Sequence, residues 1–408
     1  MSGGDSTPKL SKSDLEELLH SKVDSFKTSA LTAPGENYGS TMLLVDVMLP
    51  PDCRKLSIAA KLVPASPHMR KMFNIQDTVR KEISMYLLAR PELCAVQRES
   101  GIPEDLVLDV IPKCYGARTT RNGDIDLPVD ESSAILLENL KASGYQLVDR
   151  IVGMDLKHTE HVVTRLARLQ ATAIAIKLKK PSVFKNILLK TAFYVSNAPP
   201  PGEKGPIDSI DALSSMPLIA QHKENLKAVI KKGLELRQMK NAPAPREPFA
   251  TLVHDDLWTN NIMVSYSGDG NISGLKILDF QSVMYGSPAI DLLFFLFTST
   301  NLDMTKKECD RFIQMYYHEF VDWLELLGCD TKPFSYRTFL DELKSEGFVT
   351  FVHVFFMLRI ICLHASKAPD LTKPSEFDRI FTDNSGYDDI YFKKTERLVK
   401  EFMDRNWI

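Results

Sequence analysis

The chain has 408 residues, of which 44% are hydrophobic and 25% charged, with a formal net charge of −3 and a pI near 6.3. This composition is typical of a soluble globular protein, and the charge gives no basic footprint for nucleic acid. At roughly 150 residues per domain, the length predicts two or three domains, or two lobes of one enzyme.

The N-terminal residues and the most apolar stretch predict neither a signal peptide nor a membrane span. Residues 1–10, MSGGDSTPKL, lack the apolar core of a signal peptide, and we expect them to be disordered. The most apolar long stretch, 348–365, contains His353, Arg359 and His364, which favours a buried helix over a membrane span. The six cysteines include no C-x-x-C pair and are interpreted as reduced thiols. We therefore expect a cytoplasmic protein.

Residues 11–140 predict a strand-rich lobe with one main helix. The expected strands follow turn residues or end at proline, and the main helix has apolar residues at helical spacing. In chain order these elements are a short capped helix in 11–23, a strand before Pro50, a strand over 55–64, the main helix over 75–90, and strands over 106–118 and 133–140.

Residues 141–408 predict a mainly helical second lobe, which makes the expected fold class α+β. One strand-like run interrupts the helices, and no internal repeat is present. The expected elements are helices over 158–180 and 219–239, a strand over 275–283, and a helix over 289–299.

The stretch HDDLWTNNIMV places polar residues inside an apolar frame. His254, Asp256 and Asn261 form the pattern H-x-D-x-x-x-x-N, and Asp279 opens D-F-Q eighteen residues after Asn261. Transfer of a γ-phosphoryl group requires one carboxylate at the acceptor hydroxyl, and a carboxylate with an amide oxygen to hold Mg²⁺. We expect Asp256 to act on the acceptor, Asn261 and Asp279 to bind metal, and His254 to brace the loop. The alternative is a polar turn between two buried strands.

A kinase also needs a lysine that positions phosphate and a carboxylate that holds the lysine. Lys61 lies inside the apolar strand SIAAKLV, and Glu82 follows twenty-one residues later on the main helix. Because a charge in such a strand is costly unless it is paired, the order of these residues favours an ion pair. As isolated residues, both would be surface charges.

Two further segments are candidates for nucleotide contact. The turn PGENYGST could fold over phosphates through its backbone N–H groups, and the strand end ILLENL lies where a kinase hinge would pair with adenine. The first is otherwise an ordinary turn and the second a simple strand end. The candidate residues are Gly35, Asn37, Tyr38, Gly39, Ser40, Glu138, Asn139 and Leu140.

Taken in order, these motifs resemble the choline-kinase-like and aminoglycoside-phosphotransferase branch of the protein-kinase-like superfamily, and within it the ecdysteroid-kinase-like proteins. The segments that carry the resemblance are PGENYGS, AAKLVP, KEISMY, IPKCYGA, LLENLKASGY, HDDLWTNNIMV, ILDFQ and GSPAIDLLFFL. The resemblance implies a two-lobed kinase fold, with lobes at 11–140 and 141–408, that uses ATP and Mg²⁺. It also implies that Asp291 supports the catalytic loop, although Asp291 could equally be a charge at a helix N-terminus.

Two residues depart from the family pattern. Asp255 stands where relatives usually carry glycine, and a second carboxylate there could raise the pKa of its neighbour. Gln170 stands where relatives often have histidine, which leaves the role of that position open. No A-P-E segment follows D-F-Q, so we expect a small molecule rather than a protein as acceptor.

The resemblance and the Phe- and Met-rich stretches of the second lobe favour a lipophilic hydroxylated acceptor, such as an ecdysteroid-like steroid or a xenobiotic alcohol or glycoside. Most of these apolar residues would otherwise be helical core. We expect a monomer with a role in detoxification or hormone inactivation. The alternatives are a catalytically weak ligand-binding protein of the kinase fold and a kinase of the choline or aminoglycoside type.

Overall fold

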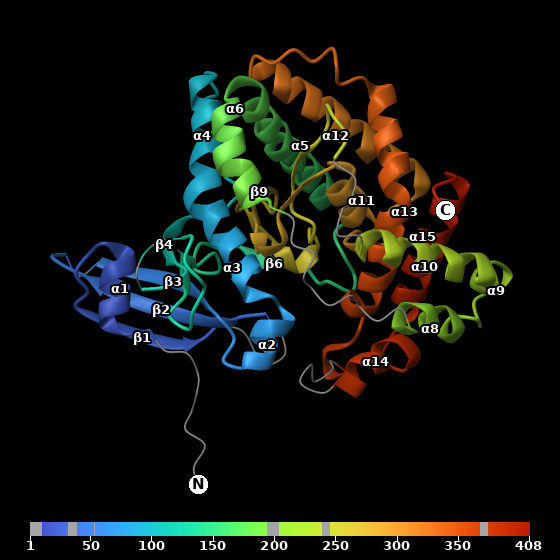
Figure 1. Ribbon diagram of the computed structural model, residues 1–408, viewed down its shortest axis with the longest axis horizontal. Helices are drawn as coiled ribbons and strands as arrows, with labels where there is room; N and C mark the ends of the chain where they lie inside the picture. The colour runs from blue at the N-terminus through green and yellow to red at the C-terminus, as the bar shows by residue number, and fades with distance from the viewer. Residues whose placement is uncertain are drawn as a thin grey trace, which may run out of the picture. The chain divides into compact units, whose positions relative to one another are not determined.

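The structure is a computed structural model that describes residues 10–31, 39–52, 54–121, 123, 125–193, 204–238, 245–367 and 374–408. The expectation of disorder at the N-terminus concerns residues 1–9, which lie outside this description, and Leu10, which is buried. The fold class is α+β, with an N-terminal antiparallel five-stranded sheet followed by a mainly helical region (Figure 1).

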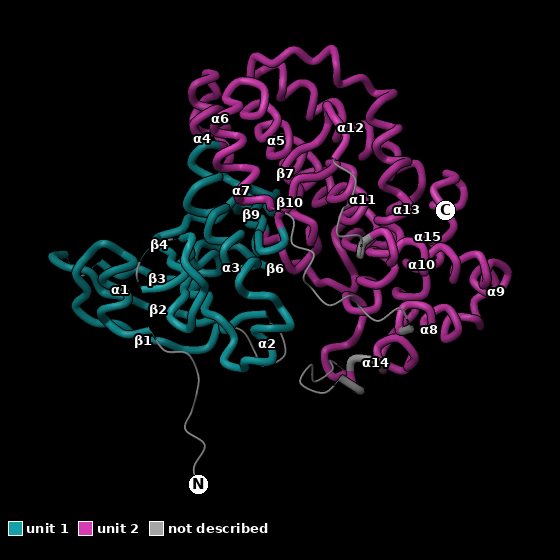
Figure 2. Tube along the Cα trace, in the orientation of Figure 1, with its two compact units in different colours: residues 1–92, 109–146, 264–282 teal, residues 93–108, 147–263, 283–408 magenta. Residues whose placement is uncertain are grey.

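The chain forms two compact units that interleave along the sequence (Figure 2). Unit 1 comprises residues 1–92, 109–146 and 264–282, and unit 2 comprises 93–108, 147–263 and 283–408. This division by compactness differs from the division into lobes at residue 140, which stays a prediction. The segment 264–282 belongs with the N-terminal sheet although it lies more than a hundred residues after it.

The five-stranded sheet of unit 1 has the order β1-β2-β3-β5-β4, and each neighbouring pair is antiparallel. Along β3, Ile58, Ala60 and Leu62 are buried on one face, so Lys61 points to the other face because side chains alternate. The strands are β1 (Ser25–Ala30), β2 (Thr41–Leu49), β3 (Arg54–Leu62), β4 (Cys114–Arg118) and β5 (Ala134–Glu138).

Helix α1 (Lys12–Leu19) covers the sheet face that carries Ile58. It begins at a capping box in which Ser11 and Asp14 bond each other's backbone, and its Leu15 and Leu18 join the core. Gly116 of β4 permits this packing, because a Cβ atom there would lie 1.9 Å from the Leu18 carbonyl oxygen.

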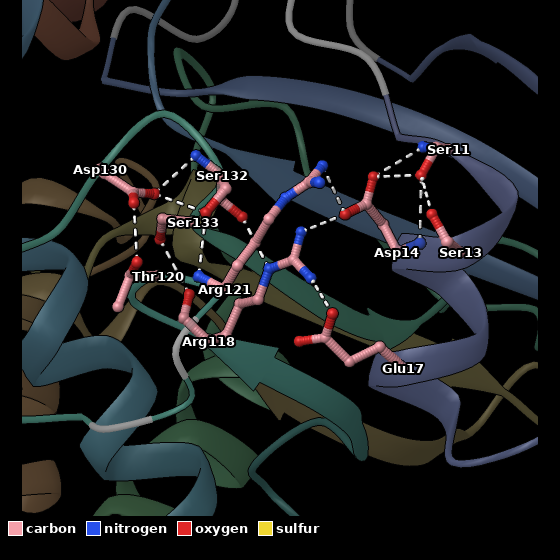
Figure 3. A network of polar contacts seen from close by, with 10 residues as sticks. All are labelled: Ser11, Ser13, Asp14, Glu17, Arg118, Thr120, Arg121, Asp130, Ser132 and Ser133. Carbon is pink, nitrogen blue, oxygen red and sulfur yellow. Dashed lines mark hydrogen bonds and ion pairs between the residues drawn. The ribbon is translucent and has the colours of Figure 1, made fainter.

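A polar network ties α1 to β4 (Figure 3). The guanidinium of Arg118 bonds Asp14 through Nη2 and Glu17 through Nη1, and its Nε donates to the Ser132 carbonyl at 2.9 Å. Arg121 reaches the same Asp14 oxygen at 2.9 Å. The side chains of Asp14 and Arg118 are each only 3% exposed, so this is a buried ion pair.

The main helix of unit 1 extends beyond its expected end. It begins as α3 (Ile75–Ser84), passes through a π-helical turn (Met85–Ala89) and continues as α4 (Arg90–Glu99). The expected strand over 106–118 is confined to β4, from Cys114. In the stretch before it, the N–H of Leu108 bonds the Gln97 side chain at 2.6 Å.

A small sheet in the order β6-β8-β9 joins β6 (Gln146–Leu147), β8 (Ile262–Tyr266) and β9 (Ile272–Ile277).

Unit 2 is helical around the short antiparallel pair β7 (Thr251–Val253) and β10 (Met284–Gly286). Its longer helices are α5 (Leu156–Lys179), α10 (Lys223–Gln238), α11 (Ala289–Thr298), α12 (Lys306–Leu326), α13 (Tyr336–Ile361) and α15 (Asp389–Asp404). The shorter elements are α2 (Pro67–Met72) in unit 1 and, in unit 2, α6 (Pro181–Val183), a π-helical turn (Phe184–Leu188), α7 (Leu189–Thr191), α8 (Lys204–Ala212), α9 (Pro217–Gln221) and α14 (Pro374–Thr382).

The apolar stretch 348–365 forms the second half of α13 and its C-terminus. Arg359 within it is fully buried and stacks on the rings of Tyr387 and Tyr391. Among the helices that the structure describes, none is long and apolar enough to cross a membrane. The five described cysteines are free thiols.

Candidate active site

In unit 1 the Lys61 ammonium contacts two carboxylates. Its Nζ donates to Glu82 Oε2 at 2.6 Å and to Asp279 Oδ1 at 2.8 Å. The Lys61 side chain is 10% exposed, and the sheet face opposite the α1 core carries it. The structure thus brings Lys61 and Glu82 together, as their order in the sequence predicted, and adds a direct contact to Asp279.

Local structure explains how each carboxylate reaches the ammonium. Glu82 lies in the last turn of α3 and is 1% exposed, next to the buried Ile83. Asp279 follows β9 in a left-handed conformation, with φ of +62°, so the strand expected over 275–283 ends at Ile277. Aspartate is one of the few residues that adopt this conformation at low cost.

The charges of these three groups do not balance. Burial would lower the pKa of Lys61, but the Coulombic attraction of Asp279 and Glu82 outweighs it and raises the pKa, so the ammonium stays charged. Burial raises the pKa of Glu82, against the opposing effect of Lys61. With both carboxylates ionised, two negative charges face one positive charge. Asp279, at 26% exposed, is the one that can meet a further cation.

In unit 2 the H-x-D-x-x-x-x-N loop follows β7 and ends in a short 3-10 turn (Thr259–Asn261). The Asn261 amide nitrogen donates to the Asp256 carbonyl at 2.8 Å and to Asp256 Oδ2 at 3.0 Å. This orientation leaves the Asn261 amide oxygen as an acceptor for a cation. The Asp256 N–H donates to His254 Nδ1 at 3.3 Å, so His254 braces the loop with that nitrogen unprotonated.

Asp291, in the first turn of α11, holds the same loop by its backbone. Its Oδ2 accepts the N–H of His254 at 2.8 Å and its Oδ1 accepts the N–H of Asp255 at 2.9 Å. Burial raises the pKa of Asp291 to about 7, while these backbone bonds oppose the shift. The contact is the support of the loop that the family resemblance implied for this position.

The two departures from the family pattern have local explanations. Asp255 has a φ of +59°, a left-handed conformation that suits glycine and that aspartate tolerates. Gln170 of α5 is fully buried, and its Nε2 donates to Asp291 Oδ2 at 2.9 Å. The sequence reasoning left the role of Gln170 open, because the partner lies 121 residues away.

The candidate nucleotide residues are only partly described. Gly35, Asn37 and Tyr38 lie outside the described residues, whereas Gly39 and Ser40 form the bend before β2. At the end of β5, the N–H of Glu138 donates to the Lys113 carbonyl at 2.9 Å. The Glu138 carboxylate accepts the N–H of Lys113 and lies 3.4 Å from the Lys276 ammonium.

The neighbouring hinge candidates also have contacts. Asn139 bonds Ser57 Oγ at 3.0 Å, and the Leu140 carbonyl accepts the N–H groups of Ser143 and Tyr145. The Glu138 N–H and the Leu140 carbonyl are therefore both bonded within the chain.

The two candidate metal ligands belong to different units, Asp279 to unit 1 and Asn261 to unit 2. Across the described part of the chain, no group of three or more His, Cys, Asp or Glu residues is placed to hold a metal. A carboxylate and an amide oxygen are each the kind of ligand that Mg²⁺ takes in proteins.

An antiparallel sheet with a buried lysine between carboxylates, followed by a helical region with a braced H-x-D-x-x-x-x-N loop, is typical of the kinase-like phosphotransferases. The chain belongs to the Ecdysteroid kinase-like family, whose model matches residues 34–329.

Several solved kinases are similar to the chain. Plasmodium vivax ethanolamine kinase is 14% identical, with 94% of this chain and 85% of that chain covered and a TM-score of 0.40. Choline kinase from Cryptosporidium parvum is 12% identical, with 94% and 91% covered and a TM-score of 0.42. An amicoumacin kinase is 14% identical, with 91% and 88% covered and a TM-score of 0.41. A search of curated proteins finds no match.

Proposed function

We propose that the protein is an ATP- and Mg²⁺-dependent kinase that transfers the γ-phosphoryl group to a hydroxyl of a small lipophilic acceptor. The observation that carries the proposal is the buried Lys61 ammonium between Glu82 and Asp279, at 2.6 and 2.8 Å. Phosphoryl transfer is catalysed mainly by positioning and by neutralising the charge of the phosphates. A lysine that stays charged in a buried site, beside the partly exposed carboxylate of Asp279, supplies both.

In unit 1, Lys61 would bind the nucleotide phosphates, and Glu82 would keep its Nζ at the end of β3. Asp279 would hold Mg²⁺, which when bound to ATP offsets the phosphate charge. Gly39 and Ser40, at the start of β2, and the backbone of Asn139 and Leu140, at the end of β5, would contribute the remaining nucleotide contacts. The chain supplies these groups from three separate segments of one unit.

In unit 2, Asp256 would orient the acceptor hydroxyl and take up its proton. The amide of Asn261 fixes the Asp256 carboxylate by a bond at 3.0 Å, and its oxygen would be a ligand for Mg²⁺. His254 and Asp291 hold the backbone on either side of Asp255. A carboxylate held in this way needs little reorganisation when the acceptor binds.

The lipophilic character of the acceptor rests on the family and on one face of α13. The phenylalanines of α11 are core residues, each at most 1% exposed, and offer no surface to a ligand. On α13, in contrast, Val349, His353, Phe356 and Ile360 are only half-buried and recur at spacings of three or four residues, which places them on one helical face. We propose this stripe as a wall for an ecdysteroid-like steroid or a xenobiotic alcohol or glycoside.

The test is a phosphorylation assay with purified protein, labelled ATP, Mg²⁺ and a panel of ecdysteroids, alcohols and glycosides, with products identified by mass. We expect Asp256→Asn to abolish turnover and Asp269→Asn to leave it unchanged. Asp269 is a matched control because it is exposed, on the turn between β8 and β9. Phe356→Ala should raise the KM for a lipophilic acceptor without changing the KM for ATP.

Three results would redirect the proposal. Unchanged turnover in Asp256→Asn would remove the assigned role of Asp256. Magnesium-dependent ATP binding without turnover on any acceptor would favour the ligand-binding alternative, and phosphorylation of choline or an aminoglycoside in preference to the steroids would favour a cationic acceptor.

A further inference from the structure

A buried chain of hydrogen bonds lies behind the H-x-D-x-x-x-x-N loop in unit 2. The Tyr316 hydroxyl of α12 donates to Gln170 Oε1 of α5, and Gln170 Nε2 donates to Asp291 Oδ2 of α11. The three residues are each at most 1% exposed. The backbone carbonyl of Gln170 also accepts a hydrogen bond from the Thr251 hydroxyl at 2.7 Å. Thr251 begins β7, the strand that leads into the loop.

The direction of every bond in this chain is determined by its neighbour. Asp291 receives N–H donors from His254, Asp255 and Gln170 and, when ionised, can only accept. In the structure the Gln170 amide turns its nitrogen to Asp291 and its oxygen to Tyr316, which is the arrangement that an ionised Asp291 requires. Burial and the nearby Asp291 charge raise the pKa of Tyr316, which keeps the proton that this arrangement requires.

We propose that Gln170 and Tyr316 are positioning residues that set the orientation of the Asp291 carboxylate and, through it, the position of Asp256. The inference rests on the proposed function in so far as Asp256 is the residue that acts on the acceptor. Asp291 grips two successive N–H groups with its two oxygens, so a rotation of its carboxylate moves or releases the backbone directly before Asp256. Gln170 opposes that rotation at Oδ2, and Tyr316 keeps Gln170 from turning.

This role separates the two kinetic constants. Tyr316→Phe removes the donor to Gln170 and leaves a buried amide oxygen without a partner, which loosens the orientation of Gln170. We expect kcat to fall about tenfold, the change that corresponds to about 1.4 kcal/mol, with the KM for ATP unchanged. If the loss of kcat came only from partial unfolding, the amount of active enzyme would fall, and the change would not be confined to the loop around Asp256.

The experiment is hydrogen exchange measured by mass spectrometry on the full-length protein, in peptides that cover residues 251–263. In Tyr316→Phe and Gln170→Leu we expect the N–H groups of this segment to exchange about five- to tenfold faster than in the wild type, because the bonds to Asp291 open more often. The matched control is Tyr317→Phe, on the same helix, which loses a hydroxyl bond to the Phe334 carbonyl at 2.8 Å and should leave the segment unchanged.

Gln170→His should retain most of the protection, because an imidazole can donate from one nitrogen and accept at the other. Unchanged exchange in a folded Tyr316→Phe protein would overturn the proposal, as would equal acceleration in Tyr317→Phe. Because the exchange experiment needs no turnover, it separates this inference from the proposed function. A protein without kinase activity still shows whether Tyr316 protects the loop, and an active Tyr316→Phe enzyme with normal kcat and normal protection refutes only the positioning role.

Discussion

The ion pair between α1 and β4 leads to a quantitative prediction for Asp14→Asn. The substitution removes the buried anion of Arg118, whose side chain is 3% exposed, and leaves Glu17 as the remaining partner. Removing one member of a buried pair typically costs about 3–5 kcal/mol, and the retained Glu17 places this case near the lower end.

The titration of Asp14 gives a second measure of the same interaction. Burial alone would raise the pKa of Asp14, but the bonds from Arg118 and Ser11 outweigh it and lower the pKa from 3.8 to about 2. At about 1.4 kcal/mol per unit, the ionised form is favoured by about 2 kcal/mol in the folded state. The two measures together predict a loss of about 2–3 kcal/mol at neutral pH.

The sign of the pH dependence follows from the lowered pKa. A carboxyl group with a depressed pKa in the folded state stabilises the protein above its unfolded pKa, and this contribution disappears as the pH falls through the folded value. The free energy of unfolding should therefore differ between the wild type and Asp14→Asn by its full amount above about pH 4. This difference should become smaller as the pH falls toward 2.

The assay has to report on unit 1. All three tryptophans, at positions 258, 323 and 407, lie in unit 2, so their fluorescence follows the other unit. Urea unfolding followed by hydrogen exchange in peptides covering residues 10–23, with far-UV circular dichroism in parallel, measures the loss directly. Glu17→Gln is the control, since Glu17 is 47% exposed and should contribute less than about 1 kcal/mol. Equal losses in the two variants, or none in Asp14→Asn, would refute the reasoning.

Three further substitutions test other features. Lys61→Met should lower turnover by roughly 10²–10³-fold because the phosphates lose their buried cation, and steady-state kinetics on an accepted substrate with a melting curve will show whether the folded enzyme is inactive. Gly116→Ala should lower the melting temperature of unit 1, since its Cβ meets the Leu18 carbonyl at 1.9 Å, whereas the exposed Gly268→Ala should not. Asp255→Gly should leave the free energy of unfolding unchanged or raise it. Asp255→Val should lower it by about 1–2 kcal/mol in urea unfolding, because a left-handed backbone disfavours a branched side chain. Equal stability of the two variants would contradict that account.

The sequence predicted those parts of the candidate site that are local or periodic. The place of Lys61 in an apolar strand, and the order of Lys61 and Glu82 before the H-x-D-x-x-x-x-N pattern, favoured the ion pair that the structure contains. The loop around Asp256 was recognisable because its residues lie within eight positions of one another. The α+β fold class and the family were confirmed.

Other features depend on contacts that no local pattern encodes. The partners of Asp14 and Gln170 lie 104 and 121 residues away, and each of these residues would be equally compatible with an exposed surface. The strand expected over 106–118 was wrong in its first half, where Val107, Leu108, Val110 and Ile111 are buried without belonging to a strand. The apolar run in this segment reflects the burial of an irregular stretch of chain and not the formation of a strand.

The assembly of unit 1 from three separate stretches of chain has a consequence for biosynthesis. The N-terminal sheet and Lys61 leave the ribosome early, but the hairpin that brings Asp279 to the ammonium is made only after about half of unit 2. Until translation passes residue 282, Lys61 can pair with Glu82 but not with Asp279, and unit 1 lacks the segment 264–282. Chaperones that hold such intermediates would meet this chain at a stage when its first unit still awaits its last segment.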